Sequence, residues 1–102
     1  MREQIAVALV NKAVTVGRLE RPEEEIALYD EVVERFGTAT ELELRSSVAW
    51  ALFDRAIALG ELGGSGDAVA AYDEVIERFG AATEPELRER VAMALVNRGF
   101  AL

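Results

Sequence analysis

Carboxylates are the reactive groups that this chain offers in greatest number, because its 102 residues include 19 Asp and Glu but no His and no Cys. The missing His removes the commonest general base and transition-metal ligand, and the missing Cys removes thiolate nucleophiles and disulfides. Two carboxylates could still act as an acid and a base, as in glycoside hydrolysis. Two adjacent pairs recur at the same place in a repeated segment: Asp30-Glu31 and Asp73-Glu74. A single active site would not be duplicated in this way, so we predict that the protein is not an enzyme.

The sequence also predicts no metal ion and no cofactor. The acidic run Glu23–Glu25 lies where a helix is expected to begin and complements the positive end of its dipole. No calcium-binding loop of the Asp-x-Asp-x-Asp-Gly type is present. The clustered glycines lack the Lys and the preceding strand of a phosphate-binding loop: Gly60, Gly63, Gly64 and Gly66.

The charge of the chain excludes further classes of partner. Eleven Lys and Arg against nineteen Asp and Glu give a net charge of −8, whereas binding to nucleic acid needs clustered positive charge. No apolar run approaches the length of a membrane span, and the N-terminus lacks the apolar region of a signal peptide. We therefore expect no nucleic acid partner, no membrane partner and a cytoplasmic location.

A polar ladder recurs once in each copy of the repeat, with Asn or Asp followed by a basic residue: Asn11-Lys12, Asp54-Arg55 and Asn97-Arg98. The amides could bind the backbone of an extended peptide. Alternatively, the basic residues could pair with acidic residues of an adjacent helix: Asp30, Glu31, Asp73 or Glu74. A charge pattern that occurs once per repeat favours the second interpretation, because a repeating interface would generate it.

The elements that carry these residues form an internal repeat of 43 residues, in which Ala27–Gly37 recurs as Ala70–Gly80. A shift of 43 without gaps makes 29 of the 59 overlapping pairs identical. The units are residues 1–37, 38–80 and a partial copy at 81–102. Each complete unit has the pattern of a long helix followed by a short one, with loops of a few residues that make consecutive helices antiparallel. The expected helices are 2–19, 22–36, 41–62, 66–79 and 84–102.

Local signals set the expected helix ends. Thr40 and Thr83 each stand three residues before a Glu, the spacing of a capping box, so we expect them to begin the second and third long helices. Gly37 and Gly80 follow the short helices, where we expect a left-handed residue to end each one.

Apolar residues at helical spacing predict the core. On the long helices the expected core positions are Ile5, Leu9, Ala13 and Val16, then Val48, Leu52, Ala56 and Leu59, then Val91, Leu95, Gly99 and Leu102. On the short helices they are Ile26, Tyr29, Val33 and Phe36, then Val69, Tyr72, Ile76 and Phe79. Since two helices cannot bury their own apolar faces, stacking of neighbouring units supplies the core.

These helix pairs resemble tetratricopeptide repeats. The large-small-large positions of the first helix fall on Leu52, Ala56 and Leu59, and the second helix has Ala68 four residues before Tyr72. The resemblance implies an all-α, right-handed helical-repeat solenoid of five antiparallel helices, formed by two units and the first helix of a third. The 43-residue period departs from the usual 34 or so and lies within the range of HEAT and armadillo repeats, about 40–47. Glu25 stands where the family has Ala.

The resemblance also implies a partner-binding groove on the concave face. Its positions are Val7, Val10, Asn11 and Val14 on the first long helix, Trp50, Phe53, Asp54 and Ile57 on the second, and Met93, Val96, Asn97 and Phe100 on the third. Trp and Met are favoured at binding surfaces. The same stripe could instead pack against another helix or a second subunit, since aromatic residues at helical spacing are common in cores.

Function and assembly follow as expectations. We predict an interaction scaffold that binds a protein or peptide, with a homo-oligomerisation module or a regulatory segment of a larger protein as the alternatives. The last helix would expose Val91, Leu95 and Leu102, so the chain is either a segment of a longer array or a homo-oligomer formed through its terminal helices.

Overall fold

Residues 1–101 of the computed structural model are described here, and within them the chain is all-helical with no strand. The five helices are α1 (Arg2–Arg18), α2 (Pro22–Phe36), α3 (Leu42–Glu61), α4 (Ser65–Phe79) and α5 (Pro85–Ala101). Each end lies within one residue of its predicted position, apart from the predicted end at residue 102, which lies outside the described residues. The all-α class and the alternation of long and short helices are thus confirmed.

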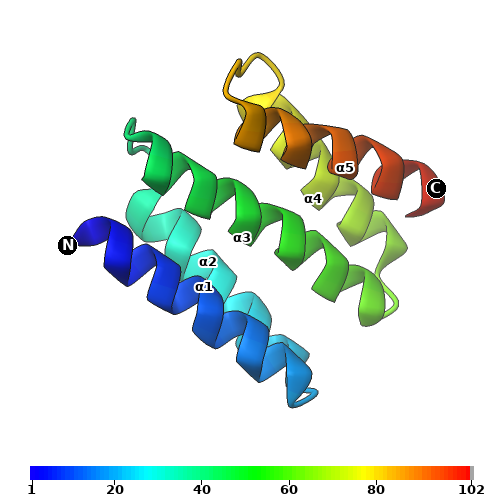
Figure 1. Cartoon of the computed structure of the whole chain (residues 1–102). Helices are drawn as coiled ribbons and strands as arrows, with labels where there is room; N and C mark the ends of the chain where they lie inside the picture. The colour runs from blue at the N-terminus through cyan, green and yellow to red at the C-terminus, as the bar shows by residue number, and fades with distance from the viewer. Residues whose placement is uncertain (102) are drawn as a thin grey trace.

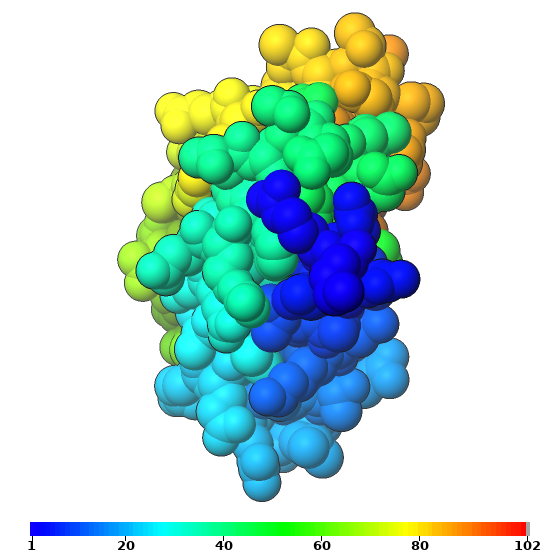
Figure 2. All heavy atoms as spheres, turned by 90° about the vertical axis from the view of Figure 1, so that its left-hand side faces the viewer, coloured from blue at the N-terminus to red at the C-terminus, as the bar shows by residue number. Residues whose placement is uncertain are grey.

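The helices form two layers (Figure 1). The long helices α1, α3 and α5 lie side by side and run in the same direction, while α2 and α4 lie behind them and run back. Helix α2 contacts both α1 and α3, and α4 contacts both α3 and α5. The three long helices therefore begin at the same end of the molecule, one above another (Figure 2).

The core is centred on α3, which contacts all four other helices. Leu44, Val48 and Leu52 of α3 are no more than 2% exposed. The predicted aromatic positions of the short helices are also buried: Tyr29, Phe36, Tyr72 and Phe79. The arrangement thus buries apolar side chains mainly between the two layers.

Some predicted core positions lie elsewhere. Ile5 is 37% exposed and Leu95 is 52% exposed, because no helix covers those sides of α1 and α5 in the described part of the chain. Gly99 is exposed too, and Leu102 lies outside the described residues. On the short helices, the prediction missed Val32 and Val75, which are fully buried. In their place it named four half-buried residues: Ile26, Val33, Val69 and Ile76.

The predicted capping boxes are not formed. Helix α3 has Glu41 as its N-cap residue and no side-chain cap hydrogen bond. At the start of α5, the backbone N–H groups of Leu87 and Arg88 donate to the carbonyl oxygen of Glu84 at 3.1 and 3.0 Å. Both helices begin one residue later than the box requires, so Thr40 and Thr83 precede the cap position.

The glycines after the short helices also differ from the prediction. Gly37 and Gly80 have right-handed conformations, with φ of −61° and −60°. Glycine is needed there for space, because a Cβ atom at residue 80 would lie 2.5 Å from the carbonyl oxygen of Ile76. The left-handed residues lie at the other turn of each unit, where Glu20 has φ 60° and the equivalent Gly63 has φ 84°.

Candidate functional site in the furrow between α1 and α3

Two hollows follow one another along the line where α1 meets α3, and we call them together the α1–α3 furrow. The upper hollow, nearer the start of both helices, has a volume of about 410 Å³. It is lined by Val7, Val10, Asn11, Leu42, Glu43, Ser46, Ser47, Trp50 and Glu86. The lower hollow, of about 250 Å³, is lined by Val14, Gly17, Arg18, Glu25, Tyr29, Asp54, Ile57 and Glu61.

Trp50 is the largest side chain of the upper hollow and is 45% exposed. Its indole Nε1 donates to Asp54 Oδ2 at 2.5 Å. The Arg90 guanidinium carbon lies 4.3 Å from the centre of the indole ring, a cation–π distance. These two contacts hold the ring in place while part of its surface stays open to solvent. A fixed, half-exposed aromatic ring is a suitable anchor for a ligand, since little side-chain entropy is lost on binding.

The lower hollow contains a small polar network. The hydroxyl of Tyr29, a residue only 1% exposed, donates to Glu25 Oε2 at 3.1 Å. Gly17 makes room for this carboxylate, because a Cβ atom at residue 17 would lie 2.6 Å from Glu25 Oε1. The hollow also contains Asp54 and Glu61. The network therefore gathers acidic groups from α2 and α3 at the lower end of the furrow.

Burial changes the acidity of this network. It raises the pKa of the Asp54 carboxyl above its ordinary value, and the hydrogen bond from Trp50 and the charge of Arg90 offset only part of that change. Burial likewise raises the pKa of Glu25, against a hydrogen bond from Tyr29 that lowers it. The pKa of Tyr29 is raised by burial and by the two carboxylates, so its hydroxyl stays protonated and acts as a donor.

The repeat provides an internal comparison for the lower hollow. The equivalent hollow of the second unit, of about 290 Å³, is lined by Gly60, Ser65, Ala68, Tyr72, Asn97, Phe100 and Ala101. Ala68 stands there in place of Glu25, and Asn97 in place of Asp54. The same fold is therefore built without either carboxylate, and the acidic character belongs to the lower hollow of the α1–α3 furrow.

The structure divides the predicted groove residues. Seven of them line the α1–α3 furrow: Val7, Val10, Asn11, Val14, Trp50, Asp54 and Ile57. Phe53 is 2% exposed and packs with its ring centre 5.9 Å from that of Tyr72, so it belongs to the core. The four predicted positions on α5 do not line the furrow: Met93, Val96, Asn97 and Phe100. Of these, Asn97 and Phe100 line the hollow of about 290 Å³ that is equivalent to the lower hollow.

The predicted groove omitted ten residues that line the furrow: Gly17, Arg18, Glu25, Tyr29, Leu42, Glu43, Ser46, Ser47, Glu61 and Glu86. The one available signal was Glu25, which departs from the Ala expected at its position. Tyr29 was assigned to the core, and its ring is indeed buried while its hydroxyl reaches the hollow.

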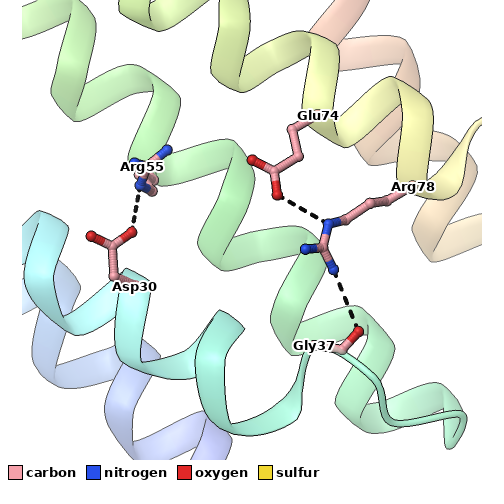
Figure 3. A network of polar contacts seen from close by, with 5 residues as sticks. All are labelled: Asp30, Gly37, Arg55, Glu74 and Arg78. Atoms are coloured by element: carbon pink, nitrogen blue, oxygen red, sulfur yellow. Dashed lines mark hydrogen bonds and ion pairs between the residues drawn. The ribbon is translucent and has the colours of Figure 1, made fainter.

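The basic residues of the polar ladder are structural where a short helix precedes them. Arg55 Nε lies 2.6 Å from Asp30 Oδ1, and the equivalent Arg98 Nε lies 2.6 Å from Asp73 Oδ1. The first of these ion pairs is drawn in Figure 3, together with Arg78, which contacts Glu74 and the carbonyl oxygen of Gly37. The prediction of pairing with an adjacent short helix is confirmed for Asp30 and Asp73.

A second ion pair, between an Arg and a Glu, also recurs in each complete unit. The Arg near the start of a long helix contacts the Glu before the next long helix: Arg2 with Glu41 at 3.3 Å and Arg45 with Glu84 at 3.2 Å. Glu31 and Glu74 were predicted to pair with the basic residues of the polar ladder, but each contacts an Arg four residues later in its own helix. These contacts occupy the ends and the short-helix layer, which leaves the furrow to its own polar groups.

The described residues were also searched for a metal site and for a membrane-spanning helix. Within residues 1–101, no group of three or more acidic side chains is placed to hold a metal ion. None of the helices in this part of the chain is long and apolar enough to cross a membrane. No protein-family model, no curated protein and no solved structure matches this chain.

Proposed function

We propose that this chain is a protein-interaction module of the tetratricopeptide-like class, a right-handed helical-repeat solenoid that binds a peptide segment of another protein in the α1–α3 furrow. The observation that carries the proposal is the 45% exposure of Trp50 in a largely apolar hollow of about 410 Å³. Large exposed aromatic rings dominate the energy of many protein interfaces. An apolar hollow with a few polar groups is also the usual form of a binding site.

The polar groups of the upper hollow suit a peptide ligand. Asn11 is exposed, and its amide has both donors and an acceptor for a peptide backbone. Ser46 and Ser47 add hydroxyl groups on the opposite wall. The side chain of Val7, which is 50% exposed, extends the apolar surface beside them. An apolar side chain could fill the hollow while its backbone bonds to these groups.

Charge specifies the partner further. Glu43 and Glu86 line the upper hollow, while the lower one contains Glu25, Asp54 and Glu61 against a single base, Arg18. The whole chain carries a net charge of −8. Complementary potentials steer association and exclude partners of like charge. The proposed ligand is therefore an amphipathic segment with an apolar anchor and a Lys or Arg beyond it. The cytoplasmic location expected from the sequence stays a prediction.

Selection from a displayed random peptide library tests this proposal. Peptides retained by the chain should combine an apolar residue with Lys or Arg, and their binding should change the fluorescence of Trp50, the only Trp in the chain. Trp50→Ala should weaken binding about tenfold or more, as expected for an interface anchor.

Met93→Ala is the matched control, because residue 93 is the equivalent of residue 50 on α5 and is 37% exposed. It should leave the affinity within about twofold. Equal losses from both substitutions, or no loss from Trp50→Ala, would show that the furrow is not the binding site.

A further inference from the structure

No other helix within residues 1–101 covers one side of α5, and we call this side the α5 free face: Ala92, Leu95, Val96 and Gly99. Leu95 and Val96 are 52% and 59% exposed. Their equivalents on α3, Leu52 and Phe53, are 1% and 2% exposed. A Cβ atom at Gly99 would meet nothing within 4 Å, although the equivalent Ala13 and Ala56 are fully buried. The face therefore has the composition of a core surface without its cover.

The repeat shows what covers this surface in the other two units. Helix α4 packs on α3, where Tyr72 meets Phe53 with ring centres 5.9 Å apart, and α2 packs on α1. Both short helices bury the same pattern, Tyr-x-x-Val-x-x-x-Phe. In α2 these residues are Tyr29, Val32 and Phe36, which are no more than 5% exposed. The template for an occupant of the α5 free face is thus a helix of this pattern.

A second observation, at Arg88, indicates the same occupant. The Arg at the equivalent position of each complete unit lies over the Phe that ends its own short helix. Arg2 lies 5.7 Å from the ring centre of Phe36, and Arg45 lies 6.0 Å from that of Phe79. Arg88 is exposed and lies over no aromatic ring in residues 1–101. A short helix on the α5 free face would bring a Phe to it.

We propose that the α5 free face binds, in trans, an amphipathic helix of a partner protein with the pattern Tyr-x-x-Val-x-x-x-Phe. A second copy of α5 is the weaker candidate, because the long helices contact one another less than they contact the short helices. The free face lies on another helix from Trp50, so this proposal does not depend on the function proposed for the furrow.

The test uses the full chain and a fluorescein-labelled peptide with the sequence of residues 65–80, which contains α4. A peptide of this length is marginally helical alone. Saturable binding should therefore appear both as fluorescence anisotropy and as a gain of helical circular dichroism. Replacing the peptide residues that correspond to Tyr72 and Phe79 by Ser should abolish both signals.

Two charge substitutions on the chain locate the peptide. Val96→Glu, on the α5 free face, should weaken binding about tenfold or more, because it would bury a carboxylate. Leu19→Glu, at a residue 61% exposed that lines neither the furrow nor the α5 free face, should leave binding within about twofold. Both residues are exposed, so the thermal unfolding of each variant should confirm that it folds.

Three outcomes would overturn the proposal. The first is absence of binding at millimolar peptide. The second is binding that Val96→Glu leaves within about twofold, which would place the peptide away from the α5 free face. The third is a dimer that Val96→Glu dissociates and the peptide does not, measured by sedimentation equilibrium, which would assign the face to a second copy of the chain.

Discussion

Phe53 and Trp50 stand three residues apart in one stripe of α3, and replacing each by Ala should have opposite consequences for folding and binding. Phe53 is 2% exposed and lies in the core against Tyr72, whereas Trp50 is 45% exposed at the furrow. Truncation of a buried Phe costs roughly 3–5 kcal/mol of unfolding free energy, because it removes apolar contact and leaves a cavity. Trp50 keeps about half of its surface in water, so we expect Trp50→Ala to lower the unfolding free energy by only about 1–2 kcal/mol.

These losses are large compared with the stability of a small domain. A chain of 102 residues is expected to have an unfolding free energy of about 5–15 kcal/mol. Phe53→Ala should therefore remove roughly 30–50% of a mid-range value of about 10 kcal/mol. With about 4–8 °C for each kcal/mol, the midpoint of thermal unfolding should fall by at least about 12 °C.

Urea unfolding followed by circular dichroism measures both variants. Val96→Ala is the matched control for Phe53→Ala, because residue 96 is its equivalent on α5 and is 59% exposed. We expect that control to lose under about 1 kcal/mol. If Phe53→Ala cost no more than Val96→Ala, or if Trp50→Ala cost as much as Phe53→Ala, the division of this stripe into core and furrow would be refuted.

Three further experiments test other features by urea unfolding. Glu20→Gly should raise the unfolding free energy by about 0.5–1 kcal/mol, because residue 20 has φ 60° and the equivalent Gly63 has φ 84°; a loss instead would show that the turn does not strain Glu20. Burial raises the pKa of Asp54 in the folded state, so the wild-type chain should gain stability as the pH falls from 7 through that pKa. Asp54→Asn should stabilise the chain at pH 7 and flatten that dependence, and an unchanged pH profile would contradict this. A double-mutant cycle on Asp30 and Arg55, which are 51% and 27% exposed, should give a coupling of about 0.2–1 kcal/mol that decreases with added salt; a coupling that is insensitive to salt would argue against an exposed ion pair.

The repeat and the helices could be predicted because both are local properties of the sequence. The helix ends were predicted to within one residue. The predictions of capping boxes at Thr40 and Thr83 and of a left-handed conformation at Gly37 were wrong. A box needs the Thr at the cap position itself, and the helices begin one residue further on. Glycine at residue 37 reflects crowding by a backbone carbonyl group, which composition alone cannot distinguish from a need for positive φ.

The candidate site was less predictable because it depends on contacts between helices. Trp50 and Phe53 lie on the same stripe, and contacts with other helices decide which of them is buried: Phe53 packs against Tyr72 of α4, and Arg90 of α5 lies over both rings. Glu25 and Asp54 are 29 residues apart in the chain and share a hollow because α2 lies against α3. The pairing of Arg55 with Asp30 could be predicted from the sequence, because the repeat places the same two residue types at equivalent positions twice.

The position of α3 has a consequence for how the molecule opens. Helices α1 and α2 are in contact with each other and with α3 but not with α5, so they can detach together and leave α3, α4 and α5 packed as before. Local opening of this kind sets the rate at which backbone amides exchange their hydrogens with water. Amide protection should therefore be highest in α3 and decline towards both ends, so that the molecule loosens one unit at a time.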